Sequence, residues 1–204
     1  MFFYISIVNH AIAFGAVSNI RYNLGGKNGK YYYRYRIHRD VDSLPFGIDG
    51  YILVRAEEED RDYILACMMD TILRSVPKEE KDLRDLWIDD ILQIVSDNMD
   101  SGVMENEAFV LKDDDGYAGM LWMGVSKDQF TCEDTGYLLG VFVDERLRRN
   151  GLGKELIRSA ERWCSLKSLM SMTLNVGSVN SAAVGLYESM GYKSQSIVMR
   201  RMLK

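Results

Sequence analysis

Residues 148–153 form a short glycine-containing loop whose residue types suit the binding of an anion. The loop follows an apolar run that predicts a strand over 137–143, and it precedes an amphipathic pattern that predicts a helix from about Gly151. A helix start exposes backbone N–H groups and the positive end of its dipole, and glycine lets a phosphate approach the backbone closely. The spacing therefore predicts a phosphate-binding loop made of Arg148, Arg149, Asn150, Gly151, Leu152, Gly153 and Lys154.

Two other nucleotide-binding motifs fail at this loop. A Walker loop needs a glycine where Arg148 stands and a serine or threonine where Glu155 stands. A dinucleotide-binding fingerprint needs a third glycine at the position of Leu156. The pattern that fits is Arg-x-x-Gly-x-Gly over residues 148–153, and taken alone it is as typical of a tight turn as of an anion site.

A second motif occupies residues 180–192, after an apolar run that predicts a strand over 172–176, and it reads Asn-x-x-Ala-x-x-Leu-Tyr-Glu-x-x-Gly-Tyr. Together, the two motifs resemble the GNAT superfamily of acetyl-CoA-dependent N-acetyltransferases. The resemblance is strong over residues 137–204 and extends back to Tyr51, whereas residues 1–48 have no counterpart in the family's minimal domain. It implies an N-acetyltransferase domain over residues 49–204, preceded by an N-terminal extension over residues 1–48.

The resemblance implies that acetyl-CoA lies where the strand over 137–143 separates from the strand over 172–176. Separation leaves backbone groups of Val141, Phe142 and Val143 without a neighbouring strand, and the amides of the pantetheine arm would pair with them. Gly140 suits a β-bulge in the first strand. The diphosphate would bind the loop residues given above.

The resemblance also assigns roles to two residues of the second motif. Tyr187 matches the family tyrosine that donates a proton to the departing thiolate, and a phenol of pKa about 10 stays protonated at neutral pH. Asn180 would cap the last helix, bind the cofactor arm, or do both. A backbone N–H near Val141 or Val143 would stabilise the oxyanion. The alternative for Tyr187 is a half-buried helix residue with no catalytic role.

The general base is the part of the site that the motifs leave open. Several relatives carry a glutamate at the strand position that Tyr137 holds here, and a phenol is a poor base at neutral pH. Glu133 and Asp134, just upstream, are candidates that would act through water, or else they are solvated loop acids. Many family members use ordered water, so a missing carboxylate is compatible with catalysis.

Hydrophobic periodicity predicts the elements that position these residues. Strands are predicted at 51–55, 107–112, 117–125, 137–143, 172–176 and 195–202, and helices at 58–75, 81–98, from about 151, and at 181–190. The helix after the loop would bury Leu152, Leu156, Ile157, Ala160, Trp163 and Cys164 on one face. In the family this order implies an α/β (α+β) fold, with a mixed, mostly antiparallel twisted sheet, splayed central strands and helices on both faces.

Composition indicates a globular protein, because 47% of the 204 residues are hydrophobic and 27% are charged. Its three cysteines lack metal-ligand spacing and it has two histidines, so we expect no metal site, no disulfide framework and a reducing, cytoplasmic location. Residues 1–20 are apolar but lack a basic n-region and a cleavage site. They predict an extra strand or hairpin, or a false gene start, rather than a signal or a membrane span.

The charge distribution bears on the partner. Residues 57–107 hold 16 acids and 5 bases, and this negative segment would attract a cationic primary amine such as a polyamine, a lysine or a protein N-terminus. Alternatively, these acids are the solvated faces of two amphipathic helices. The tyrosine- and arginine-rich run over 31–37 predicts a strand rather than a nucleic-acid site. A homodimer, and a catalytically silent acyl-CoA-binding module in place of an enzyme, stay as alternatives.

Overall fold

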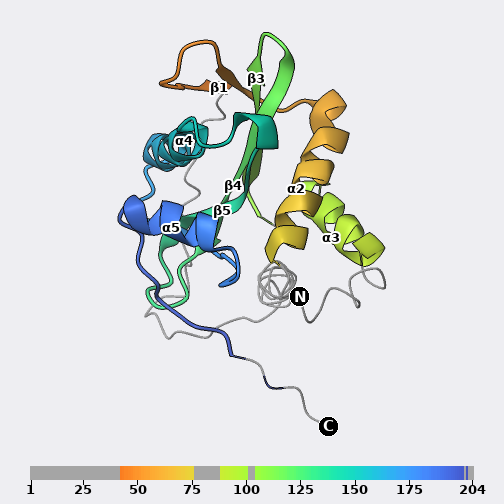
Figure 1. Cartoon of the computed structure of the whole chain (residues 1–204). Coiled ribbons are helices and arrows are strands. Elements are labelled where there is room, and N and C mark those ends of the chain that lie inside the picture. The colour runs from red at the N-terminus through yellow and green to blue at the C-terminus, as the bar shows by residue number, and fades with distance from the viewer. Residues whose placement is uncertain (1–41, 76–87, 101–103, 200, 202–204) are drawn as a thin grey trace, which may run out of the picture.

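The computed structural model describes residues 42–75, 88–100, 104–199 and 201, which form a six-stranded sheet with helices on both faces (Figure 1). The strands are β1 (Ser43–Leu44), β2 (Ile52–Arg55), β3 (Asn106–Asp113), β4 (Gly116–Lys127), β5 (Asp134–Val143) and β6 (Met172–Leu174), in this spatial order. The helices are α2 (Arg61–Ser75), α3 (Ile88–Asp100), α4 (Leu152–Leu166) and α5 (Ser181–Ser189), with 3-10 turns η2 (Glu58–Asp60) and η4 (Glu145–Leu147). All strand pairs are antiparallel except β5 with β6, which confirms the predicted mixed sheet.

Several predictions fall on residues outside this description. They are the apolar segment over 1–20, the strand over 31–37 and the first half of the helix over 81–98. Within the described ranges, no helix is both long and apolar enough to cross a membrane.

The described chain before residue 48 packs on the domain that follows it. β1 pairs with β2 at the sheet edge, and Glu155 of α4 accepts a hydrogen bond from the Gly47 N–H at 3.0 Å. Glu155 is buried, and its carboxylate also binds Arg162 Nη2 at 2.8 Å. Although burial by itself raises the pKa of this carboxyl, the hydrogen bonds from Arg162 and Gly47 hold it below its ordinary value. The boundary at residue 48 stays a prediction.

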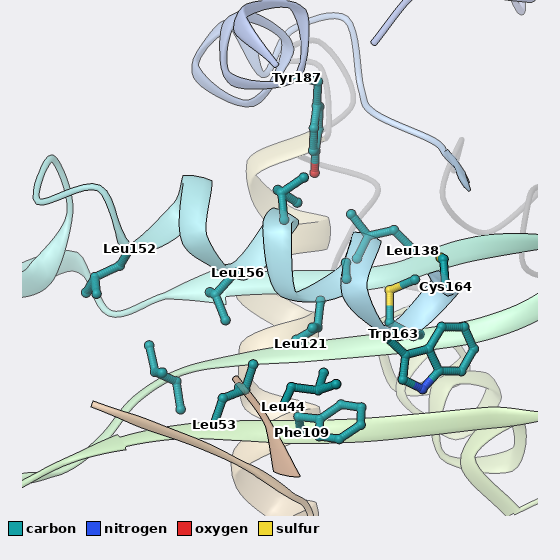
Figure 2. Close-up of a cluster of buried hydrophobic side chains, with 14 of the residues drawn as sticks. Leu44, Leu53, Phe109, Leu121, Leu138, Leu152, Leu156, Trp163, Cys164 and Tyr187 are labelled. Carbon is teal, nitrogen blue, oxygen red and sulfur yellow. The ribbon is translucent and has the colours of Figure 1, made fainter. Parts of the chain in front are cut away.

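The core consists of two clusters, one on each face of the sheet. The α4/α5-side cluster, part of which Figure 2 shows, includes all six residues that periodicity predicts to be buried on α4. The α2/α3-side cluster joins residues of α2 and α3, such as Ile64, Met68 and Val95, to side chains on the other face of β4 and β5. Because both faces of the central strands are covered, β5 is buried from Thr135 to Gly140 and becomes half-buried only from Val141 to Val143.

A β-bulge at Leu139 interrupts the alternation of side chains along β5. Trp122 of β4 lies opposite Gly140 while Met123 lies opposite Leu138, so Leu139 has no partner. An extra residue in a strand moves every later side chain to the other face. Leu139 accordingly packs in the α2/α3-side cluster, whereas Val141 packs in the α4/α5-side cluster. The bulge lies one residue before the glycine that the sequence indicates for it.

The predicted strand over 195–202 is wrong in its described part. Residues 193–199 form no strand, and in the described chain the sheet ends at β6. The sequence pattern is strand-like because Ile197, Val198 and Met199 are apolar and two of the three favour β structure, but a strand exists only where it has a hydrogen-bonding partner.

Gly119 allows β4 and β5 to pair closely at the end of β5. A Cβ at this position would clash with the backbone carbonyl oxygen of Phe142, which cannot move without shifting β5. We therefore expect Gly119→Ala to lower the free energy of unfolding by about 1–3 kcal/mol, as overpacking does elsewhere. Urea denaturation measures this.

The matched control is Gly185→Ala, because nothing lies within 4 Å of a Cβ there and the residue is inside α5. It should raise the free energy of unfolding by about 0.5–1 kcal/mol. Equal effects of the two substitutions would contradict the close approach at Gly119.

Candidate active site

The two parallel strands β5 and β6 separate soon after they begin to pair. Pairing runs from Gly136 with Met172 to Leu138 with Leu174, and beyond Leu138 no described strand pairs with this edge of β5. The unpaired stretch therefore contains the bulge at Leu139 and three of the predicted cofactor-binding residues, Val141, Phe142 and Val143. Peptide groups on such an edge can accept an added strand-like partner.

A hydrogen bond joins the two strands at the point where they part. Asn175, just after β6, donates from Nδ2 to the hydroxyl oxygen of Tyr137 on β5 at 2.7 Å. Tyr137 is 7% exposed and packs in the α2/α3-side cluster. Tyr137, at the position where the resemblance would place a glutamate, is therefore a buried phenol. Its hydrogen bond holds β5 and β6 together where they begin to separate, and the gap beyond this point is called the opening below.

The loop after β5 turns the chain directly into the start of α4. Asp144 caps η4 by accepting from the Arg146 N–H at 2.9 Å, and the chain then passes through Arg149 and Gly151, with φ of 69° and 84°. Positive φ favours glycine, so Arg149 is an unusual residue there. Gly151 is the N-cap of α4 and has no side chain to bind the first N–H groups, which leaves them for an anion.

The side chain of Arg148 lies back along β5. Its Nε donates to the Val143 carbonyl at 3.0 Å, and its guanidinium carbon lies 5.7 Å from the centre of the Phe142 ring. Its Nη2 is 3.8 Å from the carboxylate of Asp70 on α2. The Val143 carbonyl, which the sequence predicts to bind the pantetheine arm, thus already accepts a hydrogen bond from Arg148. Arg148 is itself predicted to bind the diphosphate.

The C-terminal half of α2 borders the opening on the α2/α3 face. Asp70 also binds Arg74 at 2.5 Å, and Arg74 reaches Glu145 of η4 at 3.5 Å. At its last residue, the Ser75 carbonyl oxygen lies 2.9 Å from the position of a Cβ on Gly177, in the loop after β6. Helix α2 therefore contacts both the segment over 145–148, which leads into the predicted phosphate-binding loop, and the loop at Gly177 after β6.

The second motif forms α5 on the other face. Asn180 caps this helix by accepting from the Ala183 N–H at 3.2 Å, which confirms the capping half of its prediction. Tyr187 extends from α5 toward the α4/α5-side cluster with its hydroxyl at the inward end, and it is 8% exposed (Figure 2). Burial raises the pKa of its phenol to about 12, so the group is a proton donor at neutral pH.

Glu133 and Asp134 lie at the other end of β5 from the loop. Both are exposed, and Asp134 binds Lys127 at 2.6 Å. Gly140 is six residues further along the strand than Asp134, or about 20 Å at roughly 3.3 Å per residue. That separation argues against either carboxylate acting on a group held beside the bulge.

Sequence reasoning missed two residues of this region, Asp70 and Asn175. Asp70 is one of many acids in its segment, and no neighbouring residue in the sequence distinguishes it. Its contact with Arg148, 78 positions away, is formed only by the fold. Asn175 lies inside the strand predicted over 172–176, where one polar residue carries no signal on its own; in the structure it comes just after β6. In the described part of the chain, no group of three or more His, Cys, Asp or Glu side chains could hold a metal ion.

The chain is similar to known acetyltransferases in sequence. Residues 63–192, well over half of the 204 residues, match the model of the Acetyltransferase (GNAT) family. N-acetyltransferase 8 from Homo sapiens is 28% identical over 85 residues, which cover 42% of this chain and 37% of that protein. The match thus spans little more than a third of that relative's length.

Solved structures share the fold. A putative acetyl transferase from Pyrococcus furiosus has a TM-score of 0.60 at 22% identity, over 75% of this chain and 99% of that chain. AAC(6')-Iy in complex with the bisubstrate analogue CoA-S-monomethyl-acetylneamine has a TM-score of 0.52 at 17% identity, over 76% and 98%. At these identities the likeness concerns the fold alone.

Because the pKa of Tyr187 is raised, the free energy of unfolding should change with pH in the alkaline range. In the unfolded chain a phenol ionises near pH 10, whereas in the fold Tyr187 keeps its proton to about 12. Because the unfolded state then binds fewer protons, the stabilisation from this group is complete below pH 10 and is lost as the pH rises toward 12. We expect wild type to lose stability relative to Tyr187→Phe across this window in urea denaturation. A constant difference between the two proteins would contradict the burial of the hydroxyl.

Proposed function

The chain belongs to the GNAT family of acetyltransferases, and we propose that it moves the acetyl group of acetyl-CoA to a primary amine by direct attack. The observation that carries this proposal is the unpaired edge of β5 from Leu139 to Val143, which leads straight to the uncapped start of α4. An extended chain of amides that ends in a diphosphate matches this combination, because the edge offers peptide groups and the helix start offers N–H groups.

We assign the acyl-CoA-binding residues as follows. Val141 and Phe142 offer backbone hydrogen-bonding groups to the pantetheine arm. The Val143 carbonyl already accepts a hydrogen bond from Arg148, so the arm would share this residue with Arg148. The N–H groups of the loop bind the diphosphate, and Arg148, Arg149 and Lys154 add positive charge near it. The members of this loop are Arg148, Arg149, Asn150, Gly151, Leu152, Gly153 and Lys154. Asn180 is occupied as a helix cap, so a contact with the cofactor would be additional.

The reaction needs a neutral amine, a stabilised oxyanion and a proton for the thiolate. The amine nitrogen attacks the thioester carbonyl, the C–S bond breaks, and the amine's extra proton leaves to water. Tyr187 donates a proton to the departing sulfur, for which its buried, protonated phenol is suited, and it then regains a proton from water. A backbone N–H of the unpaired β5 edge, near Val141 or Val143, stabilises the oxyanion. Neither Glu133 nor Asp134 is proposed as the base, because both lie at the end of β5 that is far from the loop.

We propose a cationic primary amine as the acceptor, either a small molecule or a peptide. The support is the acid-rich segment over 57–107, which includes α2, the helix that borders the opening. Asp70 is bound to Arg74 and lies near Arg148, so the attraction would come from the field of the whole segment rather than from this carboxylate alone.

The experiment that tests the proposed chemistry replaces Tyr187 with phenylalanine. Removal of a proton donor should lower kcat by at least about 100-fold, while CoA binds as before, because the phenyl ring keeps the packing. Release of free thiol measures kcat, and calorimetry measures CoA binding. The matched control is Tyr192→Phe, because the centre of the Tyr192 ring lies 5.8 Å from that of Tyr187. This variant also loses a phenolic hydroxyl and should keep kcat.

Two outcomes would contradict the proposal. Equal turnover by wild type and Tyr187→Phe would remove Tyr187 from the reaction. CoA binding with negligible turnover by both proteins, over a broad set of amines, would favour the silent acyl-CoA-binding module.

The acceptor class is tested by a screen with polyamines, amino acids and peptides. Cationic amines should react with higher kcat/KM than neutral or anionic ones, and added salt should lower kcat/KM for the cationic set because it screens the acidic segment. Good turnover with only uncharged or anionic acceptors would refute this class.

A further inference from the structure

Two methionine side chains fill the α2/α3 face of the sheet beside Gly140. Gly140 comes directly after the bulge at Leu139, at the start of the unpaired edge of β5. A Cβ at this position would collide with the Met68 sulfur of α2, and it would lie 3.1 Å from Cε of Met120 on β4. Even one methyl group therefore has no room on this side of Gly140.

The packing around both methionines is complete. Met68 and Met120 are each 0% exposed, and both belong to the α2/α3-side cluster. Methionine is flexible and adapts to its surroundings, so it limits the size of a neighbouring group only where other side chains prevent it from turning aside. Here the other buried members of the cluster do so, among them Trp122, Tyr137 and Leu139.

Helix α2, which carries Met68, is itself fixed near both ends. Asp60, just before the helix, accepts a hydrogen bond from the Tyr117 hydroxyl of β4 at 2.6 Å. At the other end, Ser75 meets the loop at Gly177. A shift of α2 away from Gly140 would break these contacts, so the space that Met68 fills stays filled.

The proposed acyl-CoA site brings the acyl group to this point. An acyl-CoA whose diphosphate binds at the start of α4 runs its arm from Val143 toward Gly140, because the loop follows the C-terminal end of β5. The edge is no longer free beyond the bulge, since Leu138 pairs with Leu174 of β6. The arm therefore ends beside Gly140, and the acyl group lies next to Met68.

A polar contact closes the end of the opening. Asn175 Nδ2 donates to the Tyr137 hydroxyl at 2.7 Å where β5 and β6 begin to separate. An alkyl chain that extended in this direction would separate the two groups and leave them buried without each other. Extra carbons on the acyl group would thus meet either the two methionines or this hydrogen bond.

We propose that Met68 and Met120 limit the transferred acyl group to two carbons, so that the protein discriminates against acyl-CoA thioesters with longer chains. This limit rests on the proposed acetyltransferase function and specifies its acyl donor. An apolar pocket of fixed size discriminates by about 10- to 200-fold for one methylene group. Butyryl-CoA, with two more carbons than acetyl-CoA, is therefore a sensitive probe.

Calorimetry of the full chain with CoA, acetyl-CoA and butyryl-CoA tests this limit. Wild type should bind butyryl-CoA at least about 10-fold more weakly than acetyl-CoA, because a longer chain displaces the arm from β5. Met68→Ala should reduce the difference to less than about threefold, because a cavity lined by apolar side chains can bind an apolar group.

A second variant covers the case in which Met68→Ala fails to fold, since loss of a buried side chain destabilises a core. Met120→Ala should also reduce the difference between the two thioesters. Its matched control is Met123→Ala, which removes the same side chain from the same strand. Met123 is equally buried but packs in the α4/α5-side cluster, so this variant should keep the wild-type difference.

The possible results separate the acyl limit from the proposed function. If wild type bound acetyl-CoA and butyryl-CoA equally, the limit would be overturned while the proposed function stood. The limit would also be overturned if the folded Met68→Ala and Met120→Ala proteins kept the wild-type difference, or if Met123→Ala reduced it equally. If wild type bound neither CoA nor its thioesters, the proposed function would be refuted and the limit with it.

Discussion

The early separation of β6 from β5 is the constraint on which the rest of the structure depends. Pairing stops at Leu138, and the hydrogen bond between Asn175 and Tyr137 fixes the strands at that point. The bulge at Leu139 then changes which residues face each side of the sheet, so that Val141 turns toward α4 and α5. Within the described residues, an edge of peptide groups is thereby left unpaired between two well-packed faces, and the proposed cofactor site needs this edge.

Close packing against α2 keeps that edge in place. Gly140 lacks a side chain where Met68 of α2 lies directly above it, and the Ser75 end of the helix meets the loop at Gly177. An ion pair adds to this packing, because the Asp70 carboxylate of α2 lies 3.8 Å from Arg148 Nη2. Helix α2, on the proposed acceptor side, is therefore in contact with the proposed cofactor-binding loop, although the two are far apart in sequence.

Local patterns predicted most of the fold and the outline of the candidate site. The strand, loop and helix around Gly151 and the cap at Asn180 depend on residues close in sequence, so periodicity and motif spacing identify them. The bulge at Leu139 was not located to the residue, because strand register depends on the neighbouring strand. The contact between Asp70 and Arg148 joins residues that only the fold brings together. The strand predicted over 195–202 needed a neighbouring strand, and residues 193–199 do not lie beside one.

The central claim is that CoA binds along the unpaired edge of β5 and at the start of α4. Hydrogen exchange measured by mass spectrometry, with and without saturating CoA, tests it directly because bound amides exchange more slowly. CoA should slow exchange across residues 139–154 and leave residues 109–112 of β3 unchanged, because their backbone is already paired on both sides. If CoA slowed exchange elsewhere in the chain and left residues 139–154 unchanged, the account would be contradicted.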